Sequence, residues 1–380
     1  MTKNEIQNEI TLLPIVSEAT IMLSGLGKPH HKEDIKQQIK WLLGRGSKVN
    51  HDSIFWPAGI LILGLSEYLL STLDDAKDVN TNLENIINPI SSYLSKWIND
   101  GLKVSFTDDS LMGMALINIL IYSKKSNFQF DELFISAIKK GTNNIANFIK
   151  KAPADRKGSL IYHAEMDNEY IFADGAGMTA MFLSAYSALN KDDISGNLAT
   201  LQLTNYISHG IDSHTSLPYH GYNLSSGEKL GIVGWGRATG WLMMGIAGYF
   251  AAFSGNRNTE IVGYINSLID TIYEFQMNDG GFSWDISAKE GHFDSSGTAM
   301  ISYSLCKILS TSNSNIILGK ERYNKCTEIV ESSYDAIRSS ISNGKVLNSL
   351  AECIDFAQYP QRYGTNAWGQ GAALAFLSQH

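Results

Sequence analysis

The sequence predicts an all-α protein in which six helical hairpins close into one (α/α)6 barrel over residues 1–380. Two observations favour this fold class. Segments that are apolar on nearly every side recur along the chain at similar intervals, and amphipathic segments lie between them. Strand signals are few, and the best is the short run KGSLIYH that begins at Lys157. Hydrophobic residues make up 44% of the chain, which is enough to build a large core.

The apolar segments share one design, in which a polar or aromatic entry is followed by small residues and then by an apolar helix. Their starts are separated by 53 to 73 residues. A period this long, with one helix pair per unit, is typical of a helical repeat array. The small residues predict close backbone contacts at a narrow centre. The segments are WPAGILILGL at Trp56, DSLMGMALINIL at Asp109, DGAGMTAMFLSAY at Asp174, WGRATGWLMMGIAGYF at Trp235, SSGTAMISYSL at Ser295 and WGQGAALAFL at Trp368.

The segments between them carry apolar residues at intervals of three and four, with charges on the opposite face. Examples are DELFISAIKKGTNNIANFIKK from Asp131 and TEIVGYINSLIDTIYEFQM from Thr259. A helix that is apolar on most sides must be enclosed, whereas a one-faced helix can lie outside. The alternation therefore predicts six inner helices ringed by about six outer ones. An open α-solenoid would show the same repeat, but the closed barrel is favoured because the Trp, Asp and His positions cluster at one end of each unit.

Charge and cysteine content exclude several classes of function. The net charge is -8, and the Lys and Arg residues are scattered, which argues against nucleic acid as a partner. The three cysteines are widely spaced without a CxxC motif, so neither a disulfide framework nor a cysteine zinc site is expected. No stretch resembles a membrane span or an export signal. We therefore expect a cytoplasmic protein without a membrane partner.

Asp174 lies in YIFADGAGMTAMF, at the start of the third apolar segment. One interpretation is a helix N-cap, since Asp is a favoured capping residue. The other is a functional carboxylate, because further apolar segments also open with polar groups, such as Asp108 with Asp109 and Ser295 with Ser296. In a barrel of parallel inner helices these groups would gather on one rim.

The run LPYHGYN places His220 between Tyr219 and Tyr222, directly upstream of GIVGWGRATGW. A lone His is more often structural than catalytic, and the Trp residues that follow could be ordinary core. A His flanked by aromatic residues and followed by Trp and Arg is nevertheless typical of a sugar-binding wall. Aromatic faces suit the C–H faces of sugar rings, and Arg donors suit hydroxyls and carboxylates. GGFSW adds Trp284 on a tight turn before the fifth segment.

Six motifs, in this order, resemble those of the unsaturated glucuronyl and rhamnogalacturonyl hydrolases. They are DGAGMTAMFL, YHGYN, GWGRATGW, GGFSW, DSSGTAM and WGQGAAL, and the resemblance covers residues 50 to 378. WGRATGW with the upstream YHGYN is the most specific element. These six-hairpin glycosidases act on products of polysaccharide lyases. The resemblance implies an oligosaccharide substrate with a 4,5-unsaturated uronic acid at its non-reducing end, bound by a monomer or homodimer.

The resemblance also implies roles for individual residues. Asp174 would be the general acid that protonates the double bond, Asp108 the second catalytic carboxylate with Asp109 as the alternative, and His220 a further catalytic residue. No metal or other cofactor is implied. The motifs and the aromatic wall together give the expected substrate-binding residues, which are Arg237, Trp241, Trp235, Tyr219, Asp109, His163 and Trp284.

Two other classes of function remain open. The first is an ordinary glycosidase or sugar epimerase on the same barrel, since fold does not fix function. The second is a non-catalytic carbohydrate-binding protein, which would be favoured if Asp174 were only a cap. A thioether-forming cyclase is disfavoured, because the Cys and His residues lack zinc-ligand spacing. The chain departs from the family pattern where Gly175, Ala176 and Gly177 follow the acid, and this departure predicts a wider pocket or a different sugar.

Overall fold

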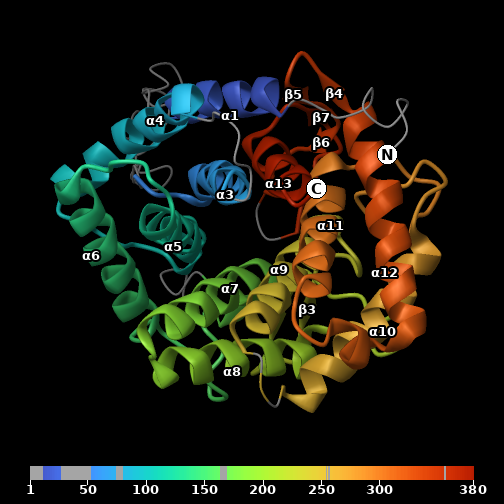
Figure 1. Ribbon diagram of the computed structural model, residues 1–380. Helices are drawn as coiled ribbons and strands as arrows, with labels where there is room; N and C mark the ends of the chain where they lie inside the picture. Colours follow the sequence, from blue (N-terminus) through green and yellow to red (C-terminus); the bar gives the residue numbers. More distant parts are fainter. Residues whose placement is uncertain are drawn as a thin grey trace, which may run out of the picture.

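The computed structural model describes residues 12–26, 53–73, 80–162, 169–253, 255, 257–354 and 357–380. Within these ranges, twelve α-helices form two concentric rings (Figure 1). The inner helices are α3 (Trp56–Ser71), α5 (Ser110–Lys125), α7 (Ala173–Asn190), α9 (Gly236–Ala252), α11 (Ser295–Leu309) and α13 (Ala367–Leu377). The outer helices are α1 (Leu13–Leu26), α4 (Asn80–Asn99), α6 (Glu132–Ile149), α8 (Asp193–Gly210), α10 (Thr259–Phe275) and α12 (Ser314–Ser339).

The inner ring is closed. Each inner helix packs against the next one in the chain, and α13 packs back against α3. Helix α1 lies in the outer ring, where it packs on α13, α3 and α4 (Figure 1). The contact between α13 and α1 therefore joins segments that are far apart in the sequence. The predicted closed barrel is confirmed, because an open solenoid would leave its first and last units apart.

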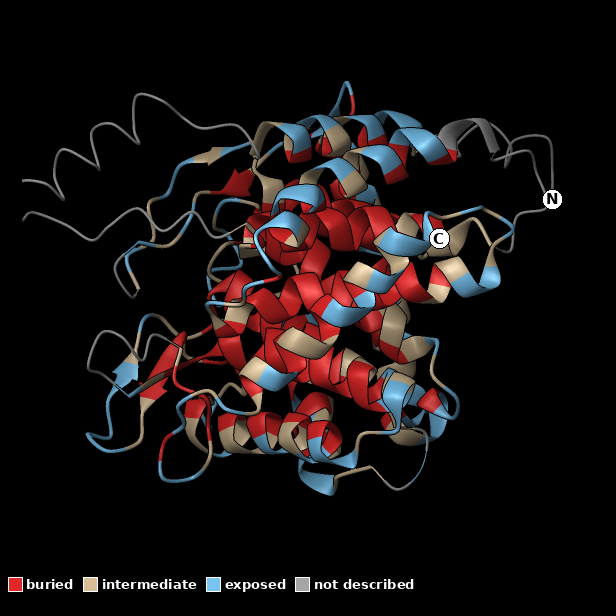
Figure 2. Ribbon diagram, turned by 90° about the vertical axis from the view of Figure 1, so that its left-hand side faces the viewer, coloured by how far each residue is buried: buried red, intermediate tan, exposed pale blue. Residues whose placement is uncertain are grey.

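Burial follows the two kinds of segment (Figure 2). Every residue of α9 from Gly236 to Ala247 is buried, as expected for a helix enclosed on all sides. The outer helix α6 buries one face only, with Ile138, Ile145 and Ile149 pointing inward. Among the residues described, no helix combines the length and the apolar character needed to cross a membrane.

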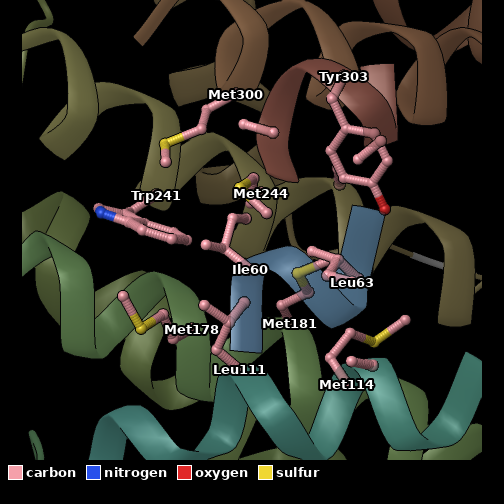
Figure 3. Packing of buried hydrophobic residues seen from close by; sticks show 14 of the residues in the cluster. Ile60, Leu63, Leu111, Met114, Met178, Met181, Trp241, Met244, Met300 and Tyr303 are labelled. Carbon is pink, nitrogen blue, oxygen red and sulfur yellow. The ribbon is translucent and has the colours of Figure 1, made fainter. Parts of the chain in front are cut away.

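Large apolar side chains fill the centre of the inner ring. Ile60, Leu111, Met178, Met244 and Met300 come from five different inner helices and meet there, each no more than 2% exposed (Figure 3). Methionine suits this position because its unbranched, flexible side chain fills irregular space where several helices converge. The centre of the ring is therefore a packed core, and ligands would have to approach from one end of the barrel.

Glycines bring the inner helices into backbone contact. A Cβ on Gly371 of α13 would clash with the carbonyl oxygen of Ile60 on α3, and a Cβ on Gly64 would clash with the carbonyl oxygen of Gly371. Helices α7 and α9 meet in the same way, where Gly177 faces the carbonyl of Trp241. The narrow centre predicted from the small residues thus extends to the α13–α3 contact that closes the ring.

Short strands lie at the rim where the inner helices begin (Figure 2, left). One antiparallel sheet has the order β1 (Tyr170–Phe172), β2 (Gly221–Asn223) and β3 (Lys229–Leu230). Strand β4 (Ile341–Ser342) pairs with β5 (Lys345–Val346), and β6 (Ser349–Leu350) pairs with β7 (Tyr363–Gly364). Because β1 runs directly into α7 and pairs with β2, the loop that carries His220 is fixed beside the start of α7.

The run KGSLIYH, expected to be the best strand, does not form one. Its Leu160 makes only an isolated bridge with Ala154. Side chains satisfy much of its backbone instead, since the Asp155 carboxylate accepts from two N–H groups of the turn and Gln202 Oε1 accepts from Leu160 N–H. A turn held by side chains therefore replaces the strand ladder.

The glycine contact that closes the ring can be tested with two Gly→Ala variants. Gly371→Ala places a methyl group against the α3 backbone, so the free energy of unfolding should fall by about 2–3 kcal/mol. Gly263→Ala, on the exposed side of α10 where nothing lies within 4 Å, should raise it by about 0.5–1 kcal/mol. Denaturant unfolding measures both. Equal effects of the two variants would contradict the proposed tight contact.

Candidate active site

Asp174 lies in the first turn of α7, but it does not cap that helix. The N-cap position belongs to Phe172, whose extended backbone leads from β1 into α7. The capping interpretation of Asp174 is therefore wrong. Its carboxylate is 14% exposed, and Oδ2 lies 3.2 Å from Nε2 of His220. The structure thus pairs two of the residues that the sequence singled out.

Pairing of β1 with β2 brings His220 to Asp174. Phe172 lies opposite Gly221 in this ladder, and the N–H of Ala173 donates to the carbonyl of His220 at 2.9 Å. The hydroxyl of Tyr206 reaches the same carbonyl at 3.1 Å and so fixes the segment from the other side. The position of His220 is thus set by its backbone, and its ring points toward Asp174 at the rim.

The ring of His220 is buried in an aromatic cage. Phe172 and Trp235 contact it edge-on, with centroid distances of 4.9 and 4.5 Å. Nδ1, on the side away from Asp174, lies 3.1 Å from the hydroxyl of Tyr359 and 4.0 Å from Sγ of Cys353. Tyr359 and Cys353 were not anticipated from the sequence. They lie between β6 and β7, in a segment without a recognisable motif.

The two adjacent aspartates before α5 do different things. Asp109 is fully buried in the 3-10 turn η1 (Thr107–Asp109), and its Oδ2 accepts from the N–H groups of Ser105 and Phe106 at 2.8 and 3.1 Å. Asp109 therefore holds its own loop together. Asp108 instead lies 3.3 Å from the hydroxyl of Tyr162, at the rim. The geometry favours Asp108 over Asp109 as the second carboxylate.

Tyr162 bonds Asp108 and lies against Gly175, the residue after Asp174. Burial raises its pKa well above the usual value, and the charges of Asp108 and then Asp174 raise it further. Tyr162 therefore stays a neutral phenol, able to donate to Asp108. Its ring also occupies the room that Gly175 leaves, since a Cβ there would lie 2.7 Å from the ring. The space expected to widen the pocket next to the acid is filled by this ring.

Arg237 is 2% exposed, and its guanidinium is bound to the backbone after β6. Nη1 donates to the carbonyl of Leu350 at 3.0 Å, and Nη2 donates to that of Ala351 at 2.8 Å. Nη1 also lies 3.4 Å from Oγ of Ser296 on the neighbouring inner helix. Burial lowers the pKa of Arg237, an effect that nearby carboxylates oppose. Arg237 is therefore a structural anchor at the rim, and its binding of a substrate carboxylate stays a prediction.

The predicted tryptophans form two groups. Trp241 lies among the buried side chains at the centre of the inner ring (Figure 3) and contacts Trp56 edge-on at 6.3 Å. Trp235 packs on Tyr359 at 5.1 Å, and Tyr359 packs on Trp284 at 5.7 Å, which makes a row of three rings leading outward from His220. Trp235 is 2% exposed and lies under the guanidinium of Arg237, so only the less buried rings of Tyr359 and Trp284 are suited to stack on a sugar.

Tyr219, a further expected binding residue, lies elsewhere. The ring of Tyr219 lies under the ammonium group of Lys229, 5.9 Å from it, on the β2–β3 side. His163 lies outside the described residues. Glu352, which the sequence did not single out, reaches solvent beside Arg237. Desolvation by the surrounding protein raises the pKa of its carboxyl, and the positive charge of Arg237 lowers it.

A cavity of about 400 Å³ lies at the opposite end of the barrel, between the C-terminal halves of the inner helices. Its lining is mainly apolar, and its polar side chains Asn118, Tyr303 and Lys307 all donate to the buried carboxylate of Glu67. The polar groups of this cavity therefore bond to one another within the protein. Asp174, His220 and the row of aromatic rings lie at the other end of the barrel. Among the described residues, no group of three His, Cys, Asp or Glu side chains could hold a metal ion.

A closed double ring of helices with acids, a His and aromatic faces at one rim defines a six-hairpin barrel suited to carbohydrate. The sequence pattern of Glycosyl Hydrolase Family 88 matches residues 28–380, and the chain belongs to this family. It is therefore a glycoside hydrolase. No curated protein matches the chain in sequence.

Solved structures share this fold. A possible member of glycoside hydrolase family 105 from Klebsiella pneumoniae has a TM-score of 0.75 at 16% identity, over 100% of this chain and 93% of that one. A family 105 enzyme from C. acetobutylicum has a TM-score of 0.67 at 17% identity, over 93% and 99%. A UGL variant with dGlcA-Glc-Rha-Glc has a TM-score of 0.64 at 14% identity, over 87% of each chain. At these identities the similarity concerns the fold.

The anchoring contacts of Arg237 predict a loss of stability in Arg237→Lys. A Lys ammonium group cannot reach two carbonyls as the planar guanidinium does, so the free energy of unfolding should fall by about 2–4 kcal/mol. Arg257→Lys is the matched control, because Arg257 also donates to two carbonyls but lies partly in solvent. Its change should stay below about 1 kcal/mol. Unchanged thermal melting of Arg237→Lys together with lost turnover would instead indicate a purely substrate-binding role.

Proposed function

We propose that this glycoside hydrolase releases a 4,5-unsaturated uronic acid from the non-reducing end of lyase-generated oligosaccharides, with Asp174 as the general acid. The observation that carries the proposal is the pairing of Asp174 with His220 at the rim. Tyr162 donates to Asp108 at the same rim. Membership of family 88 supports it, as does a structural neighbour crystallised with dGlcA-Glc-Rha-Glc. The three free thiols fit a reducing compartment, and we place the enzyme, as one barrel domain, in the cytoplasm.

The reaction would hydrate a vinyl ether. Asp174 gives its proton to C4 of the unsaturated ring, and the positive charge that develops is shared between C5 and the ring oxygen. Water then adds at C5 and loses its proton to the Asp174 carboxylate. The hemiketal that results opens and releases the neighbouring sugar. Asp174 thus acts first as an acid and then as a base, and it ends in its starting protonation state.

His220 and Asp108 support this cycle in different ways. Nε2 of His220 stands 3.2 Å from Oδ2 of Asp174, close enough to stabilise the carboxylate after the proton has left. Asp108, held through Tyr162, supplies negative charge that favours the cationic intermediate. Tyr359 and Trp284 offer faces for the sugars next to the cleaved bond, whereas Trp235 is buried behind them and supports Tyr359.

An ordinary glycosidase acting on a saturated sugar is the second candidate. The observation in its favour is that Arg237 donates to two backbone carbonyls, which leaves less of the guanidinium for a substrate carboxylate. The two candidates differ in one measurable property. Hydration of the double bond removes the ultraviolet absorbance of the conjugated uronate, whereas cleavage of a saturated glycoside does not.

The proposed function predicts activity on lyase products. Purified enzyme should remove the ultraviolet absorbance from at least one member of a panel of lyase-generated oligosaccharides and release the sugar beyond the unsaturated residue. The matched control is the same panel after chemical removal of the double bond, which should be inert. Cleavage of saturated members with no activity on unsaturated ones would overturn the proposal and favour the second candidate.

The acid role of Asp174 predicts a loss of turnover without a loss of fold. Asp174→Asn cannot deliver a proton, so kcat should fall roughly 100-fold or more while thermal melting stays close to that of the parent. Asp193→Asn, in the first turn of the outer helix α8, is the matched control and should keep full activity. Retained turnover in Asp174→Asn would move the acid role to another carboxylate, such as Asp108.

A further inference from the structure

Tyr359 contacts the ring nitrogen of His220 that faces away from Asp174. It lies after β6, and its hydroxyl is 3.1 Å from Nδ1 of His220. Trp235 and Trp284 pack on its ring at 5.1 and 5.7 Å and fix its orientation. No motif of the sequence marked this residue, and the chemistry described above uses only its ring face.

The hydrogen bonding of the Tyr359 oxygen indicates where its proton points. Burial raises the pKa of Tyr359 far above the usual value, so the hydroxyl is a neutral phenol that carries a proton. Gly231 leaves room for this hydroxyl, since its φ is +74° and a Cβ there would clash with the phenol oxygen. Nδ1 of His220, 3.1 Å away, is the group placed to accept the phenol proton.

Cys353 is the other group near Nδ1, and it is a weaker candidate. Its Sγ lies 4.0 Å from Nδ1, and the thiol donates to the carbonyl of Ile354 at 3.9 Å. Burial raises the pKa of Cys353 to about 11, so the thiol is neutral near pH 7. An S–H group is also a poorer donor than a phenol. Tyr359 therefore sets the state of Nδ1.

We propose that Tyr359 is a positioning residue that donates its phenol proton to Nδ1 of His220 and so holds the imidazole proton on Nε2, facing Asp174. The two nitrogens of a neutral imidazole carry one proton between them, so a donor at Nδ1 fixes the proton at Nε2. Phe172 and Trp235 contact the ring edge-on and oppose its rotation.

This tautomer has a direct consequence for the acid. With N–H at Nε2, His220 presents a donor 3.2 Å from Oδ2 of Asp174, so the proton to be transferred must sit on Oδ1. With the opposite tautomer, the lone pair of Nε2 would attract the carboxyl proton toward His220 and away from the substrate. The link to catalysis rests on the proposed role of Asp174, whereas the tautomer itself does not.

The tautomer can be read directly from long-range proton–nitrogen correlation spectra. The chain contains 9 His residues, so the His220 signals are assigned by their loss in His220→Gln. At a pH where the ring is neutral, wild-type His220 should carry its proton on Nε2. In Tyr359→Phe the proton should move to Nδ1 or distribute over both nitrogens. Tyr363→Phe, which removes the same hydroxyl from β7, is the matched control and should leave His220 unchanged.

Turnover provides the second readout. On an unsaturated substrate, kcat of Tyr359→Phe should fall roughly 10-fold or more with little change in KM, because a wrong tautomer impairs chemistry rather than binding. Thermal melting should stay close to that of the parent. A wild-type proton on Nδ1 would overturn the proposal even if the variant failed to fold, as would an unchanged tautomer in Tyr359→Phe. If the tautomer shifts as expected but no unsaturated substrate is turned over, the proposed function fails and the positioning role stands.

Discussion

The backbone contact between α3 and α13 closes the ring, and the rest of the molecule depends on that closure. Because every inner helix is linked to the next through an outer one, all six run in the same direction. Parallel helices place their first turns on one rim, where Asp174, Arg237 and Ser296 gather. The positive ends of six helix dipoles also meet there. That field favours a negatively charged sugar at the rim even though the net charge of the chain is -8.

Polar residues at this rim fall into two sets with different functions. Some bind backbone and hold segments in place. Asp294, for example, caps α11 and also accepts from the N–H of Leu350 at 3.0 Å, while Arg237 binds the carbonyls that follow. Others, such as Asp174 and His220, face each other across 3.2 Å and bind no backbone with their charged or ring atoms in the contacts described above. The first set restricts the motion of the segments that carry the second, so that Asp174 and His220 keep a fixed distance.

The sequence could predict the two rings and the common rim, and it singled out Asp174 and His220 separately, because apolar content and motif position are local features. Their pairing across β1 and β2 came only from the structure. The sequence could not predict Tyr359 or Glu352, whose segment has no periodicity and is placed by contacts with Arg237 and His220. The sequence also could not separate the positions of Asp108 and Asp109. One turn of 3-10 helix buries the carboxylate of Asp109 and leaves that of Asp108 at the rim beside Tyr162. The room expected beside Gly175 was filled by Tyr162, a residue thirteen positions upstream whose ring direction no pattern reveals.

Pairing α13 with α3 and α1 also has a consequence for how the molecule folds. Each of the other inner contacts joins neighbouring hairpins and can form as soon as those hairpins exist. The α13 contacts instead bring together segments from opposite ends of the chain, so they require the closure of a very long loop. An arc of five hairpins would then wait, with the apolar flanks of α3 and α11 open to water, until the last helix is inserted. Such an arc is a target for chaperones and for association between chains, and the final insertion is the step expected to limit the folding rate.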